Sequence, residues 1–136
     1  MPEKTFKIEV ITPERTVLTQ EVVSLVVPAM EGELGIMADH APLIAELAIG
    51  EIWFRDPNGE VTRLATSGGF LEVRENTVRI LVDTAERAEE IDVVRAEEAR
   101  KRAEARLRSR EEGVDLARAE AALKRAIVRL KVAKGE

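Results

Sequence analysis

The chain contains no cysteine, a single histidine and few aromatic residues: one tryptophan, three phenylalanines and no tyrosine among 136 residues. Without cysteine there is no disulfide framework, no thiolate nucleophile and no cysteine-based metal site, which fits a reducing compartment. With His40 as the only imidazole, a histidine metal cluster is impossible, and a lone histidine beside a loop is usually structural or interfacial. The sequence therefore predicts no metal site and no catalytic residue.

Net positive charge and long apolar runs are also missing. A net charge of −5 with 3% aromatic residues argues against a nucleic-acid-binding protein, which needs basic patches and stacking rings. No apolar run approaches the roughly 18 residues that cross a bilayer, and residues 1–4 (MPEK) lack the apolar stretch of a secretory signal. We therefore expect a soluble protein that contacts a membrane only indirectly, through a complex.

The charges that are present are unevenly placed. Residues 1–84 carry 7 basic and 14 acidic side chains, a net charge of −7, whereas residues 85–136 carry 14 and 12, a net charge of +2. Such asymmetry between the two halves suggests that they have different partners.

Residues 1–84 have the pattern of a β-rich domain. Residues 6–10 (FKIEV) alternate apolar and polar, as in a half-buried strand, and residues 56–59 (DPNG) are a strong hairpin signal between two apolar runs. The β-branched run at residues 22–27 is expected to end at Pro28, which cannot donate to a ladder. Residues 67–69 (SGG) are interpreted as turn glycines, because neither a Gly-Lys-Ser/Thr sequence nor a helix follows them. Many short strands with frequent turns predict a β-sandwich or barrel.

Residues 85–136 are expected to form a helical hairpin, which makes the whole chain an α+β protein of two domains, 1–84 and 85–136. Gly113 divides this part, and Asp115 can cap the second helix. The apolar stripes recur at helical spacing; they comprise Ile91, Val94, Ala99, Ala103 and Leu107, then Leu116, Ala119, Leu123, Ile127 and Leu130. Alanine faces bury little apolar area, so the hairpin should be marginally stable without a partner, as suits a switching element.

Arginines recur on one side of each expected helix. Asp92, Arg95, Ala99, Arg102 and Arg106 share a side of the first helix, and Arg118, Arg125 and Arg129 share a side of the second. If these sides close on each other, three or more guanidiniums converge, and their forks suit the oxygens of a polyphosphate. The alternative is a solvated face with weak pairs such as Asp92 with Arg95. Spacing alone favours the solvated face and leaves both interpretations open.

Three motifs, in this order, resemble the ε subunit of the bacterial F1Fo ATP synthase. They are residues 32–36 (GELGI) followed by residues 40–43 (HAPL), residues 67–73 (SGGFLEV) and residues 91–96 (IDVVRA). The similarity spans the whole chain. The sequence departs from the family at residues 37–39 (MAD), where relatives usually have a Leu/Tyr-Pro-Gly type of turn.

The resemblance implies a regulatory role in a rotary motor that synthesises ATP from an ion gradient. In the family, the β-sandwich lies at the foot of the central stalk, held by the γ subunit and touching the c-ring, with Glu33 and His40 in or beside the loops that face the ring. The two helices either fold on the sandwich or extend towards the α and β subunits, where they block ATP hydrolysis. The protein would then be a non-catalytic, peripheral subunit at the cytoplasmic face of the bacterial plasma membrane.

Several bacterial members of the family bind ATP in the folded hairpin through an Ile/Leu-Asp-x-x-Arg-Ala motif. In this chain the motif supplies Ile91, Asp92, Arg95 and Ala96, and the supporting residues of the family match Glu86, Arg102, Arg125 and Arg129. No cofactor is required, and ATP is expected as a regulatory ligand and not as a substrate. A stalk adaptor whose tail does not respond to nucleotide is the alternative.

Overall fold

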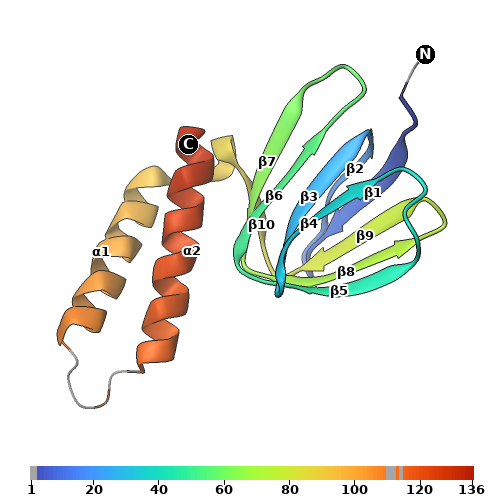
Figure 1. The fold of residues 1–136 in the computed structure, drawn as a ribbon. Helices are drawn as coiled ribbons and strands as arrows, with labels where there is room; N and C mark the ends of the chain where they lie inside the picture. The colour runs from blue at the N-terminus through green and yellow to red at the C-terminus, as the bar shows by residue number, and fades with distance from the viewer. Residues whose placement is uncertain (1–2, 110–112, 114) are drawn as a thin grey trace.

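The computed structural model describes residues 3–109, 113 and 115–136. The strands are β1 (Phe6–Ile11), β2 (Thr16–Val22), β3 (Ser24–Ala29), β4 (Gly32–Met37), β5 (Leu43–Leu47), β6 (Gly50–Arg55), β7 (Val61–Thr66), β8 (Gly69–Arg74), β9 (Thr77–Val82) and β10 (Ala85–Arg87). A 3-10 turn, η1 (Ala88–Glu90), leads into two helices, α1 (Val93–Ser109) and α2 (Leu116–Lys134). The predicted α+β fold, a β-sandwich or barrel followed by a helical hairpin, is thereby confirmed (Figure 1).

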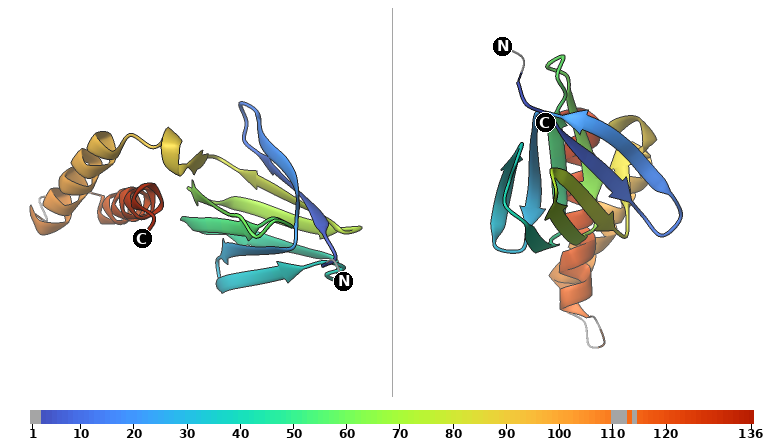
Figure 2. Two further views of the ribbon diagram at one scale, coloured as in Figure 1. Left: turned by 90° about the horizontal axis from the view of Figure 1, so that it is seen from above. Right: turned by 90° about the vertical axis from the view of Figure 1, so that its right-hand side faces the viewer.

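The strands form one curved sheet that folds over itself into a nearly closed sandwich (Figures 1 and 2). Its strand order is β10-β7-β6-β3-β5-β8-β9-β1-β2, with β4 paired to β3. The pairing of β1 with β9 is parallel, and it brings the first strand beside one of the last. Side chains that alternate along the strands point inward to a single core of large aliphatic residues and two phenylalanines, Phe6 and Phe54.

Local turn chemistry sets the two hairpins that the sequence predicts. In the first, an Asp56 carboxylate oxygen accepts the backbone N–H groups of Asn58 and Glu60, at 2.8 and 2.9 Å. In the second, Glu75 and Asn76 adopt positive φ angles of 51° and 57°, the left-handed conformation that a two-residue hairpin turn requires.

Two stretches differ from the expectation. Pro28 does not end its strand but lies within β3, which has a partner on each side through the β4 and β5 pairings; its carbonyl accepts the N–H of Ala48 at 2.7 Å. Residues 85–87 were expected at the start of the helical part, yet they form β10, which pairs with β7. The first helix begins at Val93, after Asp92 accepts the Arg95 N–H at 3.1 Å as an N-terminal cap.

The hairpin rests on the sandwich through one helix. In both figures α2 lies between α1 and the sheet (Figures 1 and 2), and α2 contacts β6, β7 and β10. A small cluster of Ala65, Ile91 and Val132 joins it to the sheet. Asp115 caps α2 as predicted, accepting the Arg118 N–H at 3.1 Å. In the described parts of the chain, no helix is both long and apolar enough to cross a membrane.

Candidate functional site

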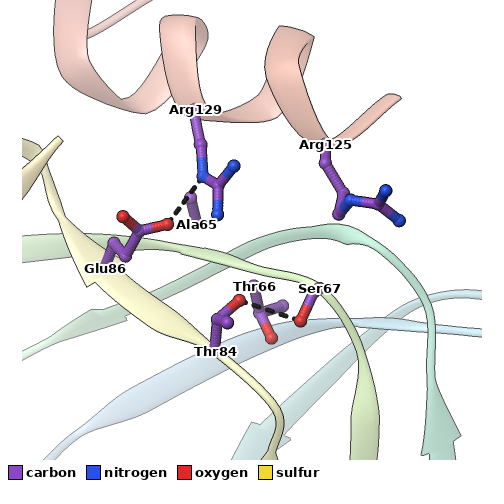
Figure 3. A pocket seen from close by; sticks show the side chains of 7 residues that line it. All are labelled: Ala65, Thr66, Ser67, Thr84, Glu86, Arg125 and Arg129. Atoms are coloured by element: carbon purple, nitrogen blue, oxygen red, sulfur yellow. Dashed lines mark hydrogen bonds and ion pairs between the residues drawn. The ribbon is translucent and has the colours of Figure 1, made fainter. Parts of the chain in front are cut away.

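A small pocket lies where α2 meets the sheet (Figure 3). Arg125 and Arg129 line it from successive turns of α2, and Glu86 lines it from β10. Its floor is made by Ala65 and by three hydroxyl side chains, Thr66, Ser67 and Thr84. The pocket therefore combines two guanidiniums and a carboxylate with neutral hydrogen-bonding groups.

One of the two guanidiniums is already paired. The Arg129 Nε–H donates to Glu86 Oε1 at 2.7 Å, with both side chains about one-third exposed. The Arg125 guanidinium points away from Glu86 (Figure 3). On the floor, the Thr84 hydroxyl donates to the Ser67 hydroxyl at 2.8 Å, and Thr66 Oγ1 accepts the Gly68 N–H at 3.2 Å. Arg125 thus takes no part in the ion pair with Glu86.

The pocket is nearly closed in this state. Its free volume is about 10 Å³, about the space that one water molecule needs, whereas ligand pockets usually measure about 300–1,000 Å³. A ligand larger than a water molecule can enter only if the Arg125 and Arg129 side chains turn outward or α2 shifts from the sheet.

A second, open groove runs between the helices at their connected end. It is lined by Arg106 of α1 and by Arg118 and Arg125 of α2, with a volume of about 460 Å³. These three arginines belong to the two stripes that the spacing of the sequence indicates, and their assignment to a polyphosphate site stays a prediction. Arg125 lines both the groove and the small pocket.

The residues of the 91–96 motif do not gather in the pocket but lie in several different environments. Ile91 is buried beside the pocket, against Ala65 and Val132, and Ala96 is buried in α1. Asp92 caps its own helix. Arg95 and Arg102 are exposed on α1 and do not line the pocket. The structure therefore brings together Glu86, Arg125 and Arg129, with Ile91 adjacent, and leaves the α1 arginines outside; their assignment as nucleotide ligands stays a prediction.

The expected c-ring residues lie at opposite ends of β4. Glu33 is exposed near the start of the strand and lines a shallow groove of about 420 Å³ with Met30 and Ile44. His40 follows the end of the strand, where its Nδ1 lies 2.8 Å from the Ala41 carbonyl oxygen. Beside it, Asp39 has a φ of 62° and its N–H donates to the Asn76 side chain at 2.8 Å. The role of both residues as an interface stays a prediction.

Sequence reasoning missed the hydroxyl floor. Residues 67–69 were interpreted as turn glycines. Ser67 and Gly68 link β7 to β8, and Gly69 is the first residue of β8; Gly68 has a φ of 106°, and a Cβ there would lie 2.9 Å from the Leu47 carbonyl oxygen. The same link places Ser67 opposite Thr84, a juxtaposition that only the sheet pairing reveals. No group of three or more potential metal-binding side chains occurs in the described residues.

Comparisons with known proteins agree with this two-part architecture. The family model "ATP synthase, Delta/Epsilon chain, beta-sandwich domain" matches residues 5–88, and "ATP synthase, Delta/Epsilon chain, long alpha-helix domain" matches residues 89–134. The chain therefore belongs to the delta/epsilon chain family of ATP synthases, which confirms the resemblance found in the sequence.

Individual relatives narrow the match to the epsilon type. The ATP synthase epsilon chain of Syntrophomonas wolfei is 51% identical over 81% of this chain and 80% of its own length, and that of Pelotomaculum thermopropionicum is 50% identical over 79% of each. Among solved structures, a chain in the Euglena gracilis mitochondrial ATP synthase (OSCP/F1/c-ring) superposes with a TM-score of 0.83 at 26% identity, covering 96% of this chain and 81% of that one. An epsilon chain is a non-catalytic subunit of the central stalk, as the sequence predicted.

Proposed function

We propose that the protein links the γ subunit to the c-ring and restrains ATP hydrolysis through its C-terminal helices, with ATP favouring the folded hairpin. One observation carries the regulatory part: the pocket is shared between the two parts of the chain. Glu86 belongs to the sheet, whereas Arg125 and Arg129 belong to α2. These residues line one pocket only while α2 lies on the sheet, so a ligand that binds them stabilises the folded arm and no other state.

The chemistry of the pocket suits an anion with several oxygens. Arginine forks bond phosphate oxygens in pairs, and the groove lined by Arg106, Arg118 and Arg125 provides room beside the pocket for a chain of phosphates. The motif residues Ile91, Asp92, Arg95 and Ala96 and the supporting Arg102 complete the proposed nucleotide site by resemblance to the family. In this proposal ATP is a ligand and not a substrate, because the proposed site includes no general base, no metal ligand and no Walker lysine.

The extended arm would act at a distance. A helix from residue 92 to residue 132 would span about 60 Å at 1.5 Å per residue, long enough to leave the sandwich and reach the α and β subunits. The excess of basic residues in the arm suits acidic segments on those partners. In this proposal the protein is peripheral, on the F1 side at the cytoplasmic face of a bacterial plasma membrane.

The sandwich offers separate surfaces for the rotor partners. Glu33 and His40 are proposed to face the c-ring. On the outer face, Phe70 of β8 and Leu81 of β9 are direct neighbours in the ladder and are 55% and 48% exposed. We propose that this adjoining exposed apolar pair is part of the contact with the γ subunit.

Titration of the isolated protein with ATP by calorimetry tests the nucleotide site. Arg125→Ala and Arg95→Ala should each weaken binding at least tenfold, because each removes a charge-assisted contact. Lys131→Ala is the matched control, since it removes a basic side chain from an exposed position of the same helix. An unchanged affinity for ATP in both arginine variants would contradict the assignment of the nucleotide site.

A structural adaptor with an unresponsive tail is the second candidate, and the closed pocket of about 10 Å³ favours it. A truncation after Glu90 separates the two functions, because it removes the helices but keeps β10 in the sheet. The regulatory proposal expects the truncated subunit to assemble and ATP hydrolysis by the complex to rise. Normal assembly with unchanged hydrolysis would support the adaptor.

A further inference from the structure

The surface of the sheet beneath α2 has a row of three residues from three adjacent strands. Glu51 of β6 lies opposite Ala65 of β7, and Ala65 lies opposite Glu86 of β10. Ala65 is 3% exposed and contacts Val132 of α2. A small side chain at the centre lets the helix approach closely, and the two carboxylates flank the point of contact.

Each carboxylate connects to the C-terminal half of the arm, but by a different route. Glu86 accepts directly from Arg129 of α2 at 2.7 Å. Glu51 acts through Arg63 of the neighbouring strand, whose Nε and Nη2 donate to the two Glu51 oxygens at 2.6 and 2.8 Å. The same Nη2 donates to the main-chain oxygen of Glu136 at 2.6 Å.

The position of Arg63 suits a contact between the sheet and the C-terminal end of α2. Glu136 follows Gly135, the left-handed residue that ends α2 with a φ of 70°. The end of a helix has unpaired carbonyl oxygens and the negative pole of the helix dipole, so a cation is favourable there. The bidentate bond to Glu51 raises the pKa of Arg63 above its usual value and fixes the orientation of its guanidinium.

We infer that Glu51 and Arg63 form a lock that holds the C-terminal end of α2 on the sheet, separate from the nucleotide pocket. Neither residue lines that pocket, so the lock stabilises the docked arm in the absence of nucleotide. Its consequence for regulation rests on the proposed function, because weaker docking would then lower the apparent affinity for ATP without changing a ligand residue.

Amide hydrogen exchange of the nucleotide-free protein, followed by mass spectrometry, tests the lock. In Arg63→Leu, amides of the last two turns of α2 should exchange about tenfold faster, which corresponds to 1.4 kcal/mol. Glu51→Gln should act in the same direction with a smaller effect, because Arg63 remains but is no longer oriented. Amides of β1 and β9 should keep their exchange rates, which shows that the sandwich remains folded.

Arg55→Leu is the matched control. Arg55 lies on β6 and has its own bidentate bond to a carboxylate, but that carboxylate belongs to Glu3 of the N-terminal segment. Trp53, the only tryptophan, lies opposite Arg63 in the ladder, so its emission should change in Arg63→Leu and serves as a second readout.

Unchanged exchange of α2 in both Arg63→Leu and Glu51→Gln would overturn the lock. Equal acceleration in Arg55→Leu would also overturn it, because the effect would then follow from any loss of charge on the sheet. Faster exchange in the two lock variants, combined with no response of either the native protein or the variants to ATP, would support the lock and contradict the nucleotide proposal.

Discussion

The two parts of the molecule are stabilised by different kinds of packing. The sandwich buries phenylalanine, isoleucine, leucine and valine almost completely, with side chains such as Phe54 and Ile80 at 0% exposure. In the hairpin, the fully buried positions of α1 and half of those of α2 are alanines. Because apolar area contributes roughly 25 cal/mol per Å², the sandwich has a large reserve of stability and the hairpin has little. We therefore expect that the arm can leave the sheet without unfolding the domain that carries it.

Removing a large core side chain should give the largest effect. Phe54→Ala is expected to lower the free energy of unfolding by about 3–5 kcal/mol, because it leaves a cavity in the sandwich. Urea denaturation followed by circular dichroism measures this change. Phe70→Ala is the control, since Phe70 is 55% exposed and its loss should change the stability by less than about 0.5 kcal/mol. Equal losses in the two variants would contradict the assigned core.

A smaller change should release the arm alone. Val132→Ala removes part of the contact with Ala65 and Ile91 and should weaken docking by about 1–2 kcal/mol, at about 0.8 kcal/mol per buried methylene. Hydrogen exchange should then accelerate in α2 while the unfolding midpoint of the sandwich stays the same. A matching fall in sandwich stability would show that the two parts unfold as one unit.

Loss of the helix cap should lower the stability of α2 by about 1 kcal/mol. Asp115→Ala removes the acceptor of the Arg118 N–H and should fray the first turn of α2, as measured by exchange of its amides. Asp115→Asn keeps an acceptor oxygen and should restore most of the protection. If both variants exchange alike, the cap contributes nothing.

The smallest expected effect is a loosening of the hairpin in acid. Arg100, through its hydrogen bond, lowers the pKa of Glu97 below the ordinary value of 4.5, and Lys134 lies 3.8 Å from the same carboxylate. A carboxyl whose pKa is lowered by folding stabilises the folded state above pH 4.5, and this contribution is lost as the pH falls through the lowered pKa. Exchange of α1 and α2 amides should therefore rise below about pH 4.5 in the native protein and less so in Glu97→Gln.

Periodicity and turn chemistry predicted the elements of both parts, because alternation, hairpin turns and the Asp115 cap are local. Two local expectations failed for tertiary reasons. Pro28 remains within β3 even though it lacks an N–H donor, and residues 85–87 become a strand because β7 offers them an open edge.

The candidate site was predictable only in part. Helical spacing placed Arg125 and Arg129 on one side of α2, and the structure brings that side to the sheet. Spacing carries no information on which strand faces a helix, so the row of Glu51, Ala65 and Glu86 and the hydroxyl floor could not be read from the sequence. The same limit applies to Arg95 and Arg102, which share a stripe on α1 but are turned to solvent.

The most direct test of the account is hydrogen exchange of α2 at increasing ATP concentration, with β1 and β9 as internal references. The account predicts that saturating ATP slows exchange in α2 and leaves the reference strands unchanged, because ATP binds only the folded arm. This protection should be lost in Arg129→Ala, which removes the residue that joins the arm to Glu86. ATP binding without any slowing of α2 exchange would contradict the claim that nucleotide holds the arm in its folded state.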